Sequence, residues 1–125
     1  LVGRIKDMIK RSGENISAAE VEDCLCMLPG IVLAAVVPVL DTARGEEVKA
    51  YVVLGAGQSD DDITPAKIIA HCAEHLAPFK IPRYLAYAES LPMTASDDKV
   101  AKPQLTGGIE DLTAGAYDRS DGVWR

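Results

Sequence analysis

The stretch GRIKDMIKRSGENIS, residues 3–17, decides the fold of this 125-residue chain. Its Ser12-Gly13 pair is a turn signal between two short runs, residues 5–11 and 14–16, that can pair as a β-hairpin. The residues before the turn carry one acid, Asp7, and four basic residues: Arg4, Lys6, Lys10 and Arg11. Because the whole chain has a net charge of −6, this local positive cluster predicts a site that meets an anion such as a phosphate.

A helix and two strands are predicted directly after the hairpin. Ser17 to Glu20 is a capping box, in which the serine hydroxyl and the glutamate carboxylate each bind an unpaired backbone N–H. Pro29-Gly30 is expected to end the helix. The runs 31–40 and 48–54 are rich in β-branched residues and predict buried strands.

A second helix and a third strand complete the pattern. Thr64 is the predicted N-cap, with Pro65 at the first turn, where proline costs no hydrogen bond. Residues 78–82 interrupt regular structure, and residues 83–88 predict a strand. The fold class is therefore α+β: a short N-terminal β-hairpin plus a small mixed three-stranded sheet packed by two helices, in the order hairpin-α-β-β-α-β. From Pro103 onward the Gly-rich sequence predicts a loosely ordered tail.

Composition argues against several classes of function. The acidic net charge disfavours general nucleic-acid binding, which depends on a basic surface. No apolar run approaches the ~20 residues of a transmembrane helix. The cysteines Cys24, Cys26 and Cys72 lack Cys-x-x-Cys spacing, which indicates free thiols in a reducing cytoplasm, packed as small apolar residues, and no metal site. His71 and His75 are four residues apart but lack the other ligands of a metal site.

Positions 3 to about 102 resemble the C-terminal domain of adenylate-forming enzymes, the AMP-forming acyl-CoA synthetase family. The resemblance rests on residues 3–17 and on a lysine-bearing loop after the Leu91-Pro92 pair. It implies that residues 1–105 are the small lid domain of a two-domain enzyme, followed by the tail at residues 106–125. The large N-terminal adenylation domain is absent from this chain, which we therefore expect to be a fragment of a longer protein.

The resemblance implies roles for the hinge, near residues 4–7. Lys6 is the expected pivot between the two domains, and Arg4 is expected near the ribose and phosphates of the adenylate. Lys10 matches a lysine that approaches the acyl-adenylate during the second half-reaction in some members. Without the resemblance, the same residues would describe a solvated basic strand with extended lysine side chains.

The turn Ser12-Gly13-Glu14-Asn15 is the segment that, by the resemblance, lines the tunnel for the pantetheine arm of coenzyme A. A glycine there lets the backbone approach a thin apolar arm closely. The family commonly has two glycines at this turn, and Ser12 replaces the first. Gly13 could also serve simply to supply the positive φ of a hairpin turn, and both roles can hold together.

Lys99 is the candidate for the family's adenylation lysine, which contacts the carboxylate substrate and the α-phosphate. A fixed cation there stabilises the charge of the transition state more than that of the ground state. The loop departs from the family pattern: Asp98 stands where glycine is usual, and one extra residue separates Pro92 from Lys99. Loops tolerate single insertions cheaply, so Lys99 is the first choice and Lys102 the second. The plain alternative is a surface lysine balanced by Asp97 and Asp98.

The resemblance thus implies the C-terminal domain of an ATP-dependent, AMP-forming carboxylic acid–CoA ligase. The full-length enzyme would use ATP, Mg²⁺ and coenzyme A, and we expect this fragment alone to bind none of them and to be inactive. Its expected partners are the N-terminal adenylation domain of the same protein and a small-molecule carboxylic acid. No nucleic acid or transmembrane segment is expected, and the expected compartment is the cytoplasm. The alternatives are an adenylation-domain fragment of a peptide synthetase and a non-catalytic, stand-alone α+β binding module.

Overall fold

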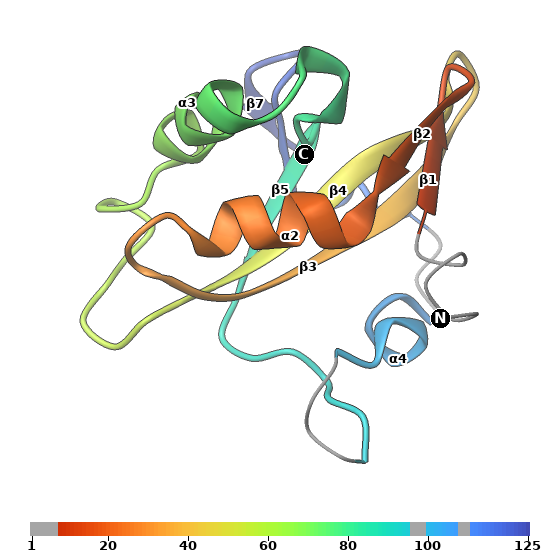
Figure 1. Cartoon of the computed structure of the whole chain (residues 1–125). Coiled ribbons are helices and arrows are strands. Elements are labelled where there is room, and N and C mark those ends of the chain that lie inside the picture. The colour runs from red at the N-terminus through yellow and green to blue at the C-terminus, as the bar shows by residue number, and fades with distance from the viewer. Residues whose placement is uncertain (1–7, 96–99, 108–110) are drawn as a thin grey trace.

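The computed structural model describes residues 8–95, 100–107 and 111–125 of the chain (Figure 1). Within these ranges the elements follow in the order β1 (Met8–Arg11), β2 (Glu14–Ser17), α2 (Ala18–Cys26), β3 (Ile31–Asp41), β4 (Gly45–Leu54), α3 (Pro65–His75), the short 3-10 helix η1 (Pro78–Lys80), β5 (Tyr84–Ala88), α4 (Lys102–Thr106), β6 (Tyr117–Asp118) and β7 (Val123–Trp124). The α+β class and the order hairpin-α-β-β-α-β are confirmed up to β5.

All the strands of the described residues belong to one mixed sheet. β4 pairs antiparallel with β3 and parallel with β5, which is the mixed three-stranded unit that the sequence predicts. The hairpin β1–β2 joins this sheet where Arg11 pairs with Gly45 of β4. With β6 and β7 added beyond β5, the described residues form a seven-stranded sheet. The sheet is therefore larger than the predicted three strands with a hairpin.

Local capping explains where the two long helices begin. The Ser17 hydroxyl oxygen accepts a hydrogen bond from the Glu20 backbone N–H at 3.3 Å, which confirms the predicted N-cap of α2. The carboxylate of Glu20 accepts a hydrogen bond from Lys80 Nζ of η1 at 2.9 Å. It therefore binds this lysine and not the backbone N–H that the predicted capping box assigns to it. Thr64 caps α3 as predicted, accepting from the Lys67 backbone N–H at 3.2 Å.

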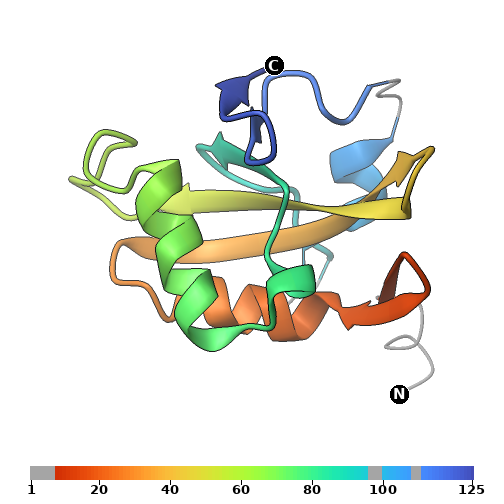
Figure 2. The same cartoon turned by 90° about the horizontal axis from the view of Figure 1, so that it is seen from above.

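Two apolar layers cover the two faces of the sheet. Helices α2 and α3 pack on one face, where the largest buried side chains include Ile9, Ile16, Leu25, Ile68 and Leu85. The opposite face has a smaller buried cluster, formed by Ala35, Val37, Tyr51 and Leu91, with Leu105 of α4 packed against it. Figure 2 shows α2 and α4 on opposite sides of β3 and β4. The alternation of inward and outward residues along each strand produces these layers.

The C-terminal residues 111–125 pack against the sheet, so the expectation of a loosely ordered tail was wrong for these residues. β6 pairs antiparallel with β5, and β7 pairs with β6. The ring of Trp124 lies against Tyr117, with 5.5 Å between the ring centroids. Strands of two residues are too short to show a periodic pattern, so their presence could not be read from the sequence.

Buried charges also hold the tail. Asp118 is 0% exposed, and its carboxylate accepts hydrogen bonds from Arg83 Nε at 3.0 Å and from Arg125 Nε at 2.7 Å. On β4, Lys49 is buried and its Nζ donates to the backbone carbonyl of Leu112. These contacts join residues that are far apart in the chain, and each buried charge has a partner, as burial requires.

Candidate functional site

The tip of the hairpin is an open, tight turn. Ser12 and Gly13 have φ values of 53° and 85°, and two positive φ angles at the centre of a two-residue loop fit the twist of a hairpin. Ser12 is the only described non-glycine residue with a positive φ. Glycine would adopt this backbone conformation with less steric strain. A Cβ added to Gly13 would meet no atom within 4 Å. The turn backbone is therefore accessible to a ligand.

The predicted hairpin residues gather on one exposed end of the molecule. Lys10 lies directly opposite Asn15 in the strand register, and both residues are exposed. Because side chains alternate along a strand, Arg11 points to the other face, where its cross-strand partner is Glu14. The tip thus presents Lys10 together with the turn residues Ser12 to Asn15, and Arg11 is turned toward the sheet.

The tip rests against the turn between β3 and β4. The Ser12 backbone N–H donates to the Arg44 carbonyl at 2.8 Å, and the Lys10 N–H donates to the Glu46 carboxylate at 2.8 Å. Arg44 Nη1 also lies 3.4 Å from the Ser12 hydroxyl oxygen. These hydrogen bonds tie the hairpin to a second loop, so the tip has a defined position relative to the sheet.

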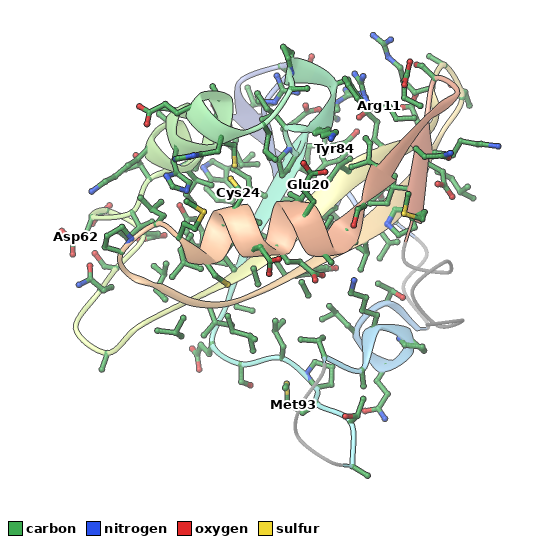
Figure 3. The ribbon with its side chains drawn as sticks, viewed as in Figure 1. Arg11, Glu20, Cys24, Asp62, Tyr84 and Met93 are labelled. Carbon is green, nitrogen blue, oxygen red and sulfur yellow. The ribbon has the colours of Figure 1, made fainter. Side chains whose placement is uncertain are left out.

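A row of charges, with two buried carboxylates and two half-buried arginines, lies behind the hairpin, and sequence reasoning missed it. Arg11 Nε donates to the buried carboxylate of Glu47 at 2.8 Å (Arg11 is labelled in Figure 3). Arg83 stands between Glu47 and Asp118. Burial alone would raise the pKa of Asp118, but the hydrogen bonds from Arg83 and Arg125 lower it to about 2. No sequence pattern connects these residues, since Arg11, Glu47 and Asp118 come from separate strands and Arg83 directly precedes β5.

The loop that carries the predicted adenylation lysine is closed at its base. Met93 and Val100 form an antiparallel bridge, and the Ala101 N–H donates to the Pro92 carbonyl at 2.7 Å. Met93 marks this loop in Figure 3. Lys99 itself lies outside the described residues, as do the predicted hinge residue Lys6 and the predicted nucleotide-binding residue Arg4. Their roles stay predictions.

Lys102, the second choice for the adenylation lysine, has a structural partner. Its Nζ lies 2.8 Å from Glu22 Oε2, and this ion pair joins α4 to α2 across the edge of the sheet. The same carboxylate oxygen accepts from the Val36 backbone N–H of β3 at 2.8 Å. Lys102 therefore helps to cover the exposed edge of β3, a role that edge strands commonly require.

The cysteines and histidines pack between α2 and α3. Cys24, on the side of α2 that faces α3 (Figure 3), shares a hydrogen bond with Cys72, and both are buried. Burial raises the pKa of both thiols, that of Cys72 to about 12. Both thiols therefore stay protonated at neutral pH and act as packed apolar groups, as the sequence predicts. Cys26 is exposed, contrary to that expectation.

The two histidines have local partners. His71 Nε2 lies 2.7 Å from the Cys24 carbonyl oxygen, and the His71 and His75 rings are 4.7 Å apart. Within the described ranges, no group of three or more histidine, cysteine, aspartate or glutamate residues could hold a metal ion. The same ranges contain no helix with the length and apolar character to cross a membrane.

Comparisons with known proteins agree with this arrangement. Residues 20–97 match the family model of the AMP-binding enzyme C-terminal domain. The chain is 40% identical over 105 residues to the putative acyl-CoA synthetase YngI of Bacillus subtilis, which covers 84% of this chain and 18% of that protein. It is 42% identical over 110 residues to the mitochondrial medium-chain acyl-CoA ligase ACSF2 of Mus musculus, covering 88% of this chain and 17% of that protein.

Solved structures show the same fold. The fatty acyl CoA synthetase of Mycobacterium tuberculosis superposes with a TM-score of 0.74 at 32% identity, over 82% of this chain and 19% of that chain. The o-succinylbenzoate CoA synthetase of Bacillus subtilis, in complex with an acyl-adenylate intermediate, has a TM-score of 0.69 at 33% identity, over 85% of this chain and 21% of that chain. The chain thus spans about a fifth of the length of each of these proteins.

Proposed function

Because this chain belongs to the family of AMP-binding enzyme C-terminal domains, as the C-terminal domain of an AMP-forming acyl-CoA synthetase, we propose that the full-length protein joins a carboxylic acid to coenzyme A using ATP. The observation that carries the proposal is the family match over residues 20–97. The names of its relatives as acyl-CoA synthetases and ligases support the same reaction. In this proposal, the large adenylation domain and the site that recognises the acid substrate lie in the part of the enzyme beyond this chain.

The proposed reaction has two half-reactions. A carboxylate oxygen first attacks the α-phosphorus of ATP, which forms the acyl-adenylate and releases pyrophosphate. Lys99 is the proposed cation that stabilises the extra charge on the α-phosphate in that transition state. The bridge between Met93 and Val100 supports this role, because it fixes the chain on both sides of the loop that carries Lys99.

In the second half-reaction the coenzyme A thiol, losing its proton, attacks the acyl carbonyl and AMP leaves. We assign the surface that faces coenzyme A in this step to the hairpin tip, residues 12–15. Lys10 would approach the acyl-adenylate. The open space around Gly13 and the exposed Lys10 support that assignment. Lys6 would serve as the pivot that exchanges the two faces, and Arg4 would lie near the ribose and phosphates.

ATP, Mg²⁺ and coenzyme A are the proposed substrates and cofactor of the full-length enzyme. The described residues offer no cluster of ligands that fits a metal ion, so no step on this domain is assigned to Mg²⁺. We propose that the N-terminal domain holds ATP with its metal, and that this chain alone is inactive. The free thiols support a reducing compartment such as the cytoplasm.

The direct test compares the full-length protein with the isolated chain. ATP–pyrophosphate exchange is measured with a panel of aliphatic and aromatic carboxylic acids, and thioester formation is then measured after coenzyme A is added. The full-length protein should show exchange that depends on an acid and should form a thioester with coenzyme A. The isolated chain should show neither activity. Exchange by the isolated chain, or transfer to a carrier protein in place of coenzyme A, would contradict the proposal.

A further inference from the structure

Glu47 is a buried carboxylate placed directly behind the hairpin. It lies on the central strand β4, and its residue is 2% exposed. Its Oε1 accepts the hydrogen bond from Arg11 Nε at 2.8 Å. Removing one member of a buried ion pair leaves the other charge without compensation. Arg11 is therefore held in one orientation by its partner.

A second arginine fixes Glu47 from the other side. Arg83 Nη1 lies 3.8 Å from Glu47 Oε2 and 3.7 Å from Asp41 Oδ1. The guanidinium of Arg83 is itself oriented by Asp118, to which Nε and Nη2 donate at 3.0 and 3.2 Å. The pair of Arg11 with Glu47 is thus connected through Arg83 to the fully buried carboxylate on β6.

Arg11 is the hairpin residue that pairs with β4 in the strand register. Its partner there is Gly45, and the turn residues 12–15 follow directly. Through its side chain, Arg11 anchors the strand end that carries the tip to Glu47 on β4. The ion pair therefore adds a side-chain anchor beside the tip to the hydrogen bonds that the Ser12 and Lys10 N–H groups donate to Arg44 and Glu46.

We infer that Glu47 is a positioning residue for the step that uses coenzyme A, and that it acts through Arg11 to set the direction of the hairpin tip. This inference rests on the proposed function, in which the tip faces the pantetheine arm. Glu47 is buried behind the strand, so it touches no substrate itself. Its effect should therefore appear in the second half-reaction and in the KM for coenzyme A, and adenylation should be unchanged.

The test uses the full-length protein with the variants Glu47→Gln, Arg11→Gln and the double variant. Single-turnover rates of adenylation and of thioester formation are measured separately, together with the KM for coenzyme A. A misplaced reacting group costs up to about 100-fold in rate, so each single variant should lose about 10- to 100-fold in thioester formation. The double variant should lose no more than the worse single one, because the two residues act as a unit.

Glu20→Gln is the matched control. Glu20 also forms an ion pair, with Lys80, but its side chain is 46% exposed and the pair lies away from the tip (Figure 3). It should leave both half-reactions unchanged. Equal losses in both half-reactions, or additive losses in the double variant, would overturn the inference. If Glu47→Gln fails to fold, Arg11→Gln, whose side chain is more exposed, provides the test by the same criteria.

The two levels of the account fail in different ways. If the unaltered full-length protein performs both half-reactions and the variants match it, the role of Glu47 is wrong and the proposed function stands. If the unaltered protein forms no acyl-adenylate with any acid and no thioester, the proposed function is wrong, and the inference about Glu47 fails with it.

Discussion

Lys99 and Lys102 are the two candidates for one role, and the partner of Lys102 supports the proposal that Lys99 fills it. The ion pair of Lys102 with Glu22 at 2.8 Å gives that lysine a structural task at the sheet edge. In the sequence, Lys99 belongs to the loop whose base is closed between Met93 and Val100. The extra residue in this loop relative to the family pattern made the register ambiguous in the sequence. The contact of Lys102 favours Lys99 for catalysis.

Lys99→Ala should slow adenylation in the full-length protein by on the order of 10²–10³, the usual cost of removing one preorganised donor. Thioester formation from supplied acyl-adenylate should persist, since the lysine stabilises charge on the first transition state. Lys102→Ala should be mild in both steps. Single-turnover adenylation is the measurement. If Lys102→Ala loses the rate and Lys99→Ala keeps it, the assignment of the loop register is wrong.

Asp118 should make the stability of the domain depend on pH. Its pKa is lowered from 3.8 to about 2 in the folded state. A carboxyl group with a depressed folded pKa stabilises the protein above its unfolded pKa, and this stabilisation is lost as the pH falls through the folded value. The shift corresponds to about 2 kcal/mol at neutral pH. Asp118→Asn should lower the free energy of unfolding by at least this order.

Denaturant unfolding at a series of pH values measures this effect. The difference between the unaltered chain and Asp118→Asn should shrink as the pH falls from about 4 to about 2. Asp121→Asn is the control: Asp121 pairs with Arg125 at 2.7 Å, but its side chain is 53% exposed, and exposed pairs contribute little. A difference for Asp118→Asn that stays constant over this pH range would contradict the account.

The elements that could be predicted are those whose signals are local. Ser17 and Thr64 mark the starts of α2 and α3, and the Ser12-Gly13 pair marks the hairpin turn. The long strands β3 and β4 were visible as apolar runs. The two-residue strands β6 and β7 were not, and neither was the joining of the hairpin to β4 through a single residue pair. Those features depend on contacts between distant residues, such as Arg83 with Asp118.

The N-cap of α2 should contribute measurably to the stability of the domain. Ser17→Ala removes the acceptor for the Glu20 N–H and should lower the free energy of unfolding by about 1 kcal/mol. Ser17→Asp keeps a capping acceptor and should retain most of the stability. Denaturant unfolding of the three proteins provides the comparison. Equal losses in both variants would show that the contact of Ser17 with its surroundings, and not the cap, is what matters.

In the proposed function, the domain is a platform that presents two separate surfaces to the reaction. The hairpin tip and the loop after Pro92 are far apart in the sequence, and one sheet with its two apolar layers joins them. The family to which the chain belongs was recognisable from residues 3–17 and the loop lysine. The platform itself, including the charges at Glu47 and Asp118, became visible only in the structure. In the proposed function this platform turns as one body about Lys6.

Rotation about Lys6 can be tested with a proline. Proline fixes φ and removes a backbone N–H, so Lys6→Pro should hold the domain in one of its two orientations. We expect this variant of the full-length protein to retain much of its adenylation and to lose most of its thioester formation. Unaltered thioester formation would place the hinge at another residue.

Single-turnover assays of both half-reactions on Lys6→Pro and Lys99→Ala test the central claim most directly, namely that one domain serves two steps with two surfaces. The account predicts a crossed result: Lys6→Pro keeps adenylation and loses thioester formation, and Lys99→Ala loses adenylation and keeps thioester formation from supplied acyl-adenylate. Parallel losses of both steps in both variants would contradict it, because a single fixed arrangement of the domain would then serve the whole reaction.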